Sequence, residues 1–370
     1  MSDTLSRPAA GLALSGDTPT RNATRIAGVG TAVPPFSYTQ REVLDIFQIT
    51  DPKVRSVFEN SAIDKRFLHL PPKDRDGRRR TESQGELLLK HRSQGVEMGS
   101  RAVLACLAQA GAELSDVAYL CCVTSTGFLT PGFTALLIRE LGLSSTCGRL
   151  DVVGMGCNAG LNGLTATTGW AAAHPGRLAL MVCIEACSAA YVFDGTMRSS
   201  VVNSLFGDGA AAVALVNGGS SGQAGPAVLK FASLLIPEAI GAMRYDWDDA
   251  HGKFSFFLDR DIPYVVGAHA EEIIARLLEG TGLRRSDIAH WLIHSGGKKV
   301  IDSVMINLNL DRHEVRHTTG VLRDFGNLSS GSFLFSYARL AEERVTRAGD
   351  YGVLMTMGPG STIETALIRW

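Results

Sequence analysis

The feature that most limits the folds open to this chain is an internal repeat. Residues 115–127 read SDVAYLCCVTSTG, and residues 286–297 read SDIAHWLIHSGG. Each stretch follows a segment that ends in Gly, and each runs from Ser-Asp through a hydrophobic strand to a turn of small residues. The two aspartates, Asp116 and Asp287, are 171 residues apart.

Two more matches follow the first in the same order along the chain. Gly156-Cys157 and Gly326-Asn327 each open a segment of small residues, with an offset of 170. Residues 177–188 then match residues 351–362. Because unrelated stretches would not keep their order and spacing, three such matches predict a duplicated chain.

The pattern inside the repeat predicts the class of fold. Hydrophobic strand-like runs alternate with helical patterns, which is typical of layered α/β architecture with helices on the faces of the sheets. We predict two similar halves, residues 25–225 and residues 226–370, after a disordered leader at residues 1–24. A site between two such halves would draw residues from both.

Composition and charge exclude several classes of protein. The 36 basic and 37 acidic side chains of the 370 residues nearly cancel, which argues against a surface devoted to nucleic acid or anionic lipid. No apolar run reaches the roughly 18 residues of a membrane span, and the polar N-terminus lacks the hydrophobic core of a signal peptide. We therefore expect a cytoplasmic protein. Gly28-Val29-Gly30 lacks the third glycine of a dinucleotide-binding loop, so we do not expect such a cofactor there.

The cysteines point to one candidate nucleophile. There are 7 cysteines without a Cys-x-x-Cys pair, so we predict no metal site. Most lie in apolar strand-like runs, as buried free thiols do in a reducing cytosol. Cys157 differs because DVVGMGCNAGLNGL places it in a Gly-rich turn between a strand and a helix. The positive end of a helix favours thiolate over thiol.

A nucleophilic cysteine needs a base or a cationic partner, and His294 is the candidate. It ends the strand-like run HWLIH just before Gly-Gly. A half-buried structural histidine is the alternative interpretation. Asn327 is the predicted repeat partner of Cys157, and its amide could donate a hydrogen bond to a developing oxyanion. Taken alone, Gly326-Asn327-Leu328 would be an ordinary helix cap.

Five separated motifs together resemble one enzyme family. They are GCNAG with Cys157, FGDGAAA at 206–212, IHSGG with His294, GNLSSG with Asn327 and MGPGST at 357–362. In order and spacing they are similar to the type III polyketide synthases of the chalcone-synthase superfamily, from about residue 25 to residue 370. The resemblance implies the thiolase fold, an αβαβα layered sandwich of two pseudo-repeated halves, and a homodimer.

The resemblance also implies roles for single residues. Cys157 would accept the acyl group, His294 would keep it ionised, and His294 with Asn327 would bind the thioester carbonyl of malonyl-CoA as CO2 leaves. The implied substrate-binding residues are the aromatic gatekeepers Phe206 and Phe256, a residue reaching across the dimer, Thr130, two cations near the CoA entrance, Lys65 and Arg66, and Met357 in the Gly-Pro-Gly loop. No cofactor is implied beyond the CoA thioesters themselves.

Three stretches narrow the resemblance further. GCNAGLNGL, CCVTSTGFLTPG and MTMGPGSTIE are most similar to actinobacterial members that make 3,5-dihydroxyphenylacetyl-CoA for glycopeptide antibiotics. This implies condensation of four malonyl-CoA followed by cyclisation, with downstream pathway enzymes as further partners. The alternatives are a ketosynthase or thiolase of the same fold with another product, and a non-catalytic scaffold.

Overall fold

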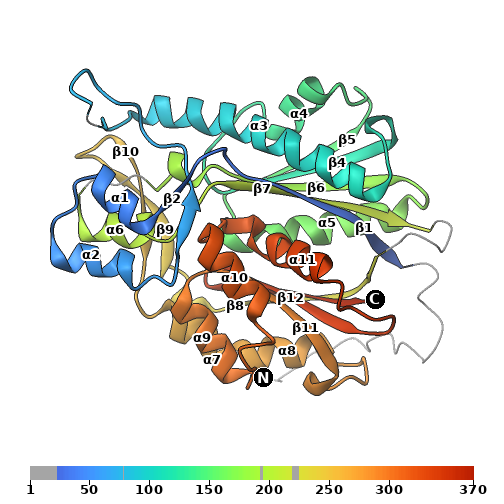
Figure 1. The fold of residues 1–370 in the computed structure, drawn as a ribbon. Coiled ribbons are helices and arrows are strands. Elements are labelled where there is room, and N and C mark those ends of the chain that lie inside the picture. Colours follow the sequence, from blue (N-terminus) through green and yellow to red (C-terminus); the bar gives the residue numbers. More distant parts are fainter. Residues whose placement is uncertain (1–22, 78, 192–194, 219–224) are drawn as a thin grey trace, which may run out of the picture.

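A mixed central sheet organises the molecule. Figure 1 shows the computed structural model of the chain, which describes residues 23–77, 79–191, 195–218 and 225–370. Nine strands pair in the order β11-β12-β13-β8-β1-β7-β6-β4-β5. Most of the predicted leader, residues 1–22, lies outside the described residues, and the first strand begins at Thr24.

The strands of this sheet are β1 (Thr24–Ala32), β4 (Val117–Thr124), β5 (Gly148–Val153), β6 (Leu178–Glu185), β7 (Gly209–Asn217), β8 (Ala227–Leu235), β11 (Ile288–Ile293), β12 (Tyr351–Gly358) and β13 (Thr362–Arg369). The pairs β4–β5, β4–β6 and β11–β12 are parallel, and the other neighbours are antiparallel. Two smaller sheets pair β2 (Ser37–Thr39) with β3 (Lys65–Phe67) and β9 (Met243–Asp248) with β10 (Lys253–Leu258).

The strand order repeats on the two sides of one seam. Outward from β1 the order is β1-β7-β6-β4, and outward from β8 it is β8-β13-β12-β11. The strands β1 and β8 meet through a single register pair, Arg25 with Ala227. The chain is therefore built from two topologically similar halves, as the repeat predicted. The exact boundary at residues 225 and 226 stays a prediction.

The helices lie in layers on the faces of the sheet. They are α1 (Gln40–Ile46), α2 (Pro52–Glu59), α3 (Gln84–Ala110), α4 (Phe133–Leu141), α5 (Ala159–Ala173), α6 (Met197–Asn203), α7 (Ile262–Ala268), α8 (Ala270–Leu278), α9 (Lys298–Asn307), α10 (Arg316–Phe325) and α11 (Ser332–Glu343). In Figure 1, α3 and α4 cover one outer face, α5 and α11 lie between the halves, and α8 covers the other outer face. The five layers are those of the predicted αβαβα sandwich.

The long helix α3 shows why the sequence folds this way. Ser83 and Glu86 form a capping box at its start, and Gly111 ends it in the left-handed conformation with φ of 64°. The helix packs closely on β1, where a Cβ atom on Gly30 would lie 2.2 Å from the backbone nitrogen of Cys106. Gly28-Val29-Gly30 is thus the middle of a strand that lets a helix approach, and not a nucleotide loop.

The spacing of the repeat changes along the chain. The short 3₁₀ turns η2 (Leu114–Asp116) and η6 (Arg285–Asp287) begin 171 residues apart, whereas η3 (Gly156–Asn158) and η7 (Ser329–Gly331) begin 173 residues apart. The helices α5 and α11 follow directly after η3 and η7. The structural counterpart of Cys157 is therefore Ser330, and the prediction that Asn327 is its repeat partner is wrong. Two extra residues precede η7, and Gly326 ends α10 where its apparent match opens a turn.

Candidate active site

One cavity of about 450 Å³ brings together most of the predicted site residues. It is lined from both halves of the chain. Of the nine residues implied by the resemblance, six line it: Cys157, His294, Asn327, Phe206, Phe256 and Met357. The predicted catalytic residues and the predicted gatekeepers therefore share one hollow.

Cys157 lies in the 3₁₀ turn η3, between the edge strand β5 and the helix α5. The turn requires glycine at 156, where φ is 79° and a Cβ atom would lie 2.1 Å from the ring of Pro359. The side chain of Cys157 is buried, and its Sγ lies 3.5 Å from Ser329 Oγ of the other half. The sequence therefore predicted the turn correctly, and α5 itself begins two residues later.

His294 follows the last residue of β11 and lies in the buried core of the site. Its backbone N–H donates to Met355 O on β12 at 2.8 Å. Its Nδ1 has no hydrogen-bond partner among the described residues. A Cβ atom on Gly296 would lie 3.0 Å from the imidazole Cδ2. Glycine at position 296, two residues after His294, therefore leaves space for the imidazole ring next to the backbone.

Asn327 is fixed on both its backbone and its side chain. Its N–H donates to Leu205 O at 2.8 Å, and its carbonyl accepts from Gly207 N–H at 3.0 Å. Its Oδ1 accepts from Ser329 N–H at 2.8 Å. This contact directs the amide nitrogen away from η7, and Nδ2 lies 3.5 Å from Gly296 O. The side chain is therefore oriented as a hydrogen-bond donor within the cavity wall.

Burial shifts the pKa values of Cys157 and His294 in opposite directions. Desolvation raises the pKa of the Cys157 thiol to about 12, against a smaller lowering by the Ser329 hydroxyl. Desolvation also lowers the pKa of His294 to about 3. Taken singly, each group is neutral at pH 7, because a lone charge here would lose its hydration.

Glu185 is a residue of the site region that the sequence reasoning missed. It ends β6 and is fully buried, and its Oε1 accepts from Ser330 Oγ at 2.5 Å while Oε2 accepts from Ser125 N–H at 3.0 Å. Burial raises the pKa of this carboxyl, and its charge contributes to the raised pKa of Cys157. The carboxyl joins the two halves next to η7. A charged residue at the end of the apolar run LALMVCIE was the available signal.

The two predicted gatekeepers are buried and face each other at right angles. The ring centroids of Phe206 and Phe256 are 6.3 Å apart with an interplanar angle of 86°. Tyr191 stacks on Phe206 at 3.9 Å, and Tyr245 lies against Phe256 at 5.0 Å. Neither tyrosine was predicted from the sequence, because each lies in a stretch without a motif. Phe256 and Tyr245 come from the β9–β10 hairpin.

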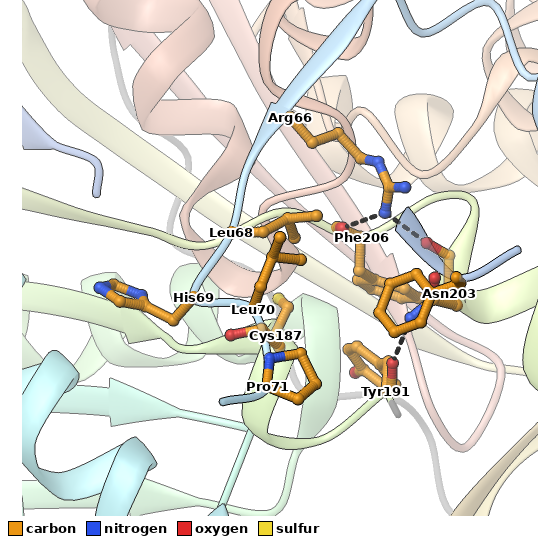
Figure 2. Close-up of a pocket in the computed structure, with 11 residues that line it drawn as sticks. Arg66, Leu68, His69, Leu70, Pro71, Cys187, Tyr191, Asn203 and Phe206 are labelled. Carbon is orange, nitrogen blue, oxygen red and sulfur yellow. Dashed lines mark hydrogen bonds between the residues drawn. The ribbon is translucent and has the colours of Figure 1, made fainter. Parts of the chain in front are cut away.

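Three predicted substrate-binding residues do not line this cavity. Thr130 is exposed in the loop before α4, and Lys65 is exposed on β3. Arg66 is only 1% exposed, because alternation along β3 turns it inward, and it lines a separate cavity of about 30 Å³ (Figure 2). Arg66 is therefore not the accessible entrance cation that the sequence predicted.

The cations that do line the larger cavity are Arg260, Lys298 and Lys299. The two lysines begin α9, directly after the Gly296-Gly297 turn that follows His294. Their adjacency to the IHSGG motif was the signal that could have identified them. The described residues contain no group of three His, Cys, Asp or Glu side chains arranged to hold a metal ion. Among the same residues, no helix is long and apolar enough to cross a membrane.

Comparison with known proteins agrees with this geometry. The chain matches the N-terminal domain of chalcone and stilbene synthases over residues 17–219 and the C-terminal domain over residues 231–370. It is 68% identical to a 3,5-dihydroxyphenylacetyl-CoA synthase of Streptomyces toyocaensis, over 95% of this chain and 91% of that protein. A second such synthase, from Amycolatopsis balhimycina, is 69% identical over 94% of this chain and 93% of its own length.

The fold agrees as well. The crystal structure of 1,3,6,8-tetrahydroxynaphthalene synthase from Streptomyces coelicolor A3(2), a bacterial type III polyketide synthase, superposes with a TM-score of 0.85 at 27% identity, covering 94% of this chain and 99% of that one. The chain has two halves of the thiolase type and a buried cysteine, histidine and asparagine in one cavity. It also matches known members along nearly its whole length, and these findings agree. The chain belongs to the chalcone and stilbene synthase family, and it is a type III polyketide synthase.

Proposed function

We propose that this enzyme condenses four molecules of malonyl-CoA and cyclises the product to 3,5-dihydroxyphenylacetyl-CoA. The observation that carries the proposal is the assembly of Cys157, His294 and Asn327 in one cavity that Phe206 and Phe256 also line. The choice of product is supported by similarity. The two named relatives that make this thioester are 68% and 69% identical, whereas a tetrahydroxynaphthalene synthase of Streptomyces peucetius is 31% identical.

The carbon balance is consistent with this product. Four malonyl units that lose four CO2 give a linear chain of eight carbons held as a thioester. Bonding the terminal methyl carbon to the third carbon from the thioester closes a six-membered ring. Loss of one water and enolisation then give a dihydroxyphenyl ring with a CH2–CO–S arm. The thioester survives the ring closure, so the product can remain attached to CoA.

The proposed mechanism begins with acyl transfer to Cys157. Its thiolate attacks the thioester carbonyl and displaces CoA thiolate, so that the acyl group is held on Cys157 beside the next substrate. The enolate of the next malonyl-CoA then attacks this acyl carbonyl and releases the Cys157 thiolate, which leaves the lengthened chain on CoA. Transfer of the Cys157 proton to His294 creates both charges together. The attraction between the thiolate and the imidazolium then offsets the hydration that each has lost on burial. The ion pair is therefore favoured over either ion alone.

The same groups serve the decarboxylation. Loss of CO2 from malonyl-CoA leaves an enolate, whose charge needs donors already directed at the carbonyl oxygen. Asn327 Nδ2–H and the imidazole N–H of His294 are the two donors that we assign to it. The Oδ1 contact with Ser329 N–H keeps the amide of Asn327 in the donating orientation.

We assign the phosphates of CoA to Arg260, Lys298 and Lys299 in place of Lys65 and Arg66. These three cations line the same cavity as the catalytic residues. A polyanion bound there would place its pantetheine arm toward Cys157 between the two phenylalanine rings. This arrangement needs no cofactor besides the substrate.

The proposed assembly is a cytoplasmic homodimer. The edge strand β5, the turn after it and the loop before α4 expose the apolar side chains Phe128, Leu150, Val153 and Met155. An edge strand of this kind is suited to pairing with a second copy. Thr130 lies in the same exposed loop, so dimerisation would bring it against the partner, as the resemblance implies. The product would then pass to downstream enzymes of a glycopeptide-antibiotic pathway.

Mass spectrometry of the products formed from malonyl-CoA alone tests the proposal. We expect release of CO2 and an aromatic CoA thioester with the mass of the dihydroxyphenylacetyl compound. The Cys157→Ala variant should keep the fold and lose acylation. A different aromatic product would refute the cyclisation, and absence of CO2 release would refute the polyketide chemistry for malonyl-CoA.

A further inference from the structure

Arg66 is the least exposed of the cations singled out by the sequence, and its position is unusual for a charge. Figure 2 shows its guanidinium above the segment that carries Asn203 and Phe206. It donates to Asn203 O, to Phe206 O at 2.8 Å, and to Gln40 Oε1 at 2.8 Å. These bonds use Nη1 and Nη2 and offset part of the cost of burying the guanidinium, whose Nε has no hydrogen-bond partner among the described residues.

Gln40 holds the carbonyl of Ser204, which lies in the same segment between Asn203 and Phe206. Its Nε2 donates to Ser204 O at 2.7 Å and to Ser61 Oγ at 2.8 Å. Arg66 and Gln40 together therefore hold the carbonyls of residues 203, 204 and 206. These carbonyls lie at the last residue of α6 and just after it, where a helix leaves its last acceptors without partners in the helix.

The held segment is paired directly with the catalytic asparagine. Leu205 O accepts from Asn327 N–H at 2.8 Å, and Gly207 N–H donates to Asn327 O at 3.0 Å. Phe206 and Asn327 form an isolated parallel bridge. Gly326 provides the room for the arginine stem, because a Cβ atom there would lie 3.0 Å from Arg66 Cγ and Cδ.

From this chain of contacts we infer that Arg66 is a positioning residue that sets Phe206 and Asn327 in register with each other. It holds the backbone of the gatekeeper, and the gatekeeper segment holds the backbone of Asn327. It touches neither CoA nor the acyl chain, because it lies outside the cavity of Cys157. The inference rests on the proposed function, since it assigns a role within that reaction.

Replacement of Arg66 should therefore reduce kcat and leave KM nearly unchanged. Displacement of catalytic groups by about 1 Å costs on the order of 10²-fold in rate, and we expect a loss of that size in kcat for Arg66→Ala. KM for malonyl-CoA should stay within about threefold, because the cations assigned to CoA are untouched. Arg66→Lys should recover little, since the three donors of an ammonium diverge from one nitrogen and do not reproduce the fork of Nη1 and Nη2.

Chemical rescue distinguishes positioning from a general loss of stability. Guanidinium chloride at low millimolar concentration should restore part of the kcat of Arg66→Ala, and urea, a neutral planar analogue, should not. Arg316→Ala is the matched control. Arg316 also donates to a backbone carbonyl, His313 O, but lies on α10 outside both cavities. It should keep kcat within about twofold of the wild type.

If Arg66→Ala does not fold, Gln40→Leu provides the second measurement, because it removes one acceptor of Arg66 and the donor to Ser204 O. We expect a kcat loss of about tenfold with unchanged KM. A folded Arg66→Ala or Gln40→Leu enzyme with wild-type kcat would overturn the inference. A rise in KM as large as the fall in kcat would overturn it too. A wild-type enzyme that releases no CO2 from malonyl-CoA would instead contradict the proposed function.

Discussion

At the scale of single residues, the proposed chemistry depends on how Cys157 and His294 share one proton. Burial raises the pKa of Cys157 to about 12 and lowers that of His294 to about 3, so neither group ionises alone near pH 7. A reactive thiolate at neutral pH consequently requires the imidazolium beside it. The pair then titrates as a unit, and its apparent pKa values belong to both groups.

This pairing can be tested through alkylation of Cys157 by iodoacetamide across pH. In the wild type we expect a rate plateau that extends to acidic pH, because the thiolate is present as an ion pair. In His294→Ala the rate should fall at neutral pH and rise only in the alkaline range, toward the raised pKa of an isolated buried thiol. Identical profiles for the two proteins would mean that no ion pair forms.

Glu185 adds a second test at the residue scale. Burial raises its pKa in the folded state, so the folded protein binds more protons than the unfolded chain in the window above the ordinary value of 4.5. Stability should then decrease as pH rises through that window up to the folded pKa. Glu185→Gln removes this titration while keeping the shape of the side chain.

We therefore expect the stability advantage of the wild type over Glu185→Gln to shrink as pH rises from about 4.5 upward. Urea denaturation at a series of pH values measures it. A gap that widens with pH would show that the carboxylate is favoured by its partners, Ser125 and Ser330, more than burial disfavours it.

At the scale of elements, the turn η3 decides where the nucleophile points. Gly156 has a positive φ and lies against Pro359 of the other half. A methyl group on Gly156 would have to displace the proline ring or the turn. Gly156→Ala should thus destabilise the fold by about 2 kcal/mol or more and abolish acylation of Cys157.

Gly169→Ala is the control for that substitution. Gly169 lies within α5, and a Cβ atom there would meet nothing within 4 Å. Alanine should be neutral or stabilising by about 0.5–1 kcal/mol in a helix interior. Thermal unfolding and acylation by malonyl-CoA compare the two variants, and equal behaviour would contradict the steric role of Gly156.

The start of α9 carries the second element-scale test. Lys298→Gln with Lys299→Gln should raise KM for malonyl-CoA by about 3- to 10-fold with little change in kcat, since exposed cations contribute modestly to binding. Added salt should reduce the difference from the wild type. Lys73→Gln, in an exposed loop outside the cavity, should change neither constant. An unchanged KM in the double variant would remove these lysines from the CoA site.

The sequence predicted the elements better than their spacing. The repeated Ser-Asp strands and the Gly-rich turn at Cys157 were predicted from local chemistry. The predicted counterpart of Cys157 was wrong because two extra residues precede η7. This insertion shows only when the position of the turn is known from the structure. The prediction that Arg66 is an exposed cation was wrong, because a Lys-Arg pair on a short strand does not show which of the two side chains faces inward.

At the scale of the whole molecule, the duplication explains why the site is assembled from distant segments. Cys157 comes from the half before the seam, whereas His294 and Asn327 come from the half after it. The repeat predicted such a shared site, since equivalent turns of the two halves face the same interior. Tyr245 could not be predicted, because only the packing of the halves brings the β9–β10 hairpin against Tyr191 of the other half.

The seam between the halves has a consequence for how this enzyme can change. Among the described residues, Arg25 and Ala227 are the one register pair across it, joined by two backbone hydrogen bonds of Ile26 with residues 225 and 226, so the backbone ladder contributes little to the relative orientation of the halves. That orientation is instead set by the layer of α5 and α11, which contacts strands on both sides. The turns η3 and η7 open those same helices. Recombining halves from two relatives would therefore break few strand hydrogen bonds, yet it would replace one wall of the active site, and the exchange of α11 would decide whether the hybrid works.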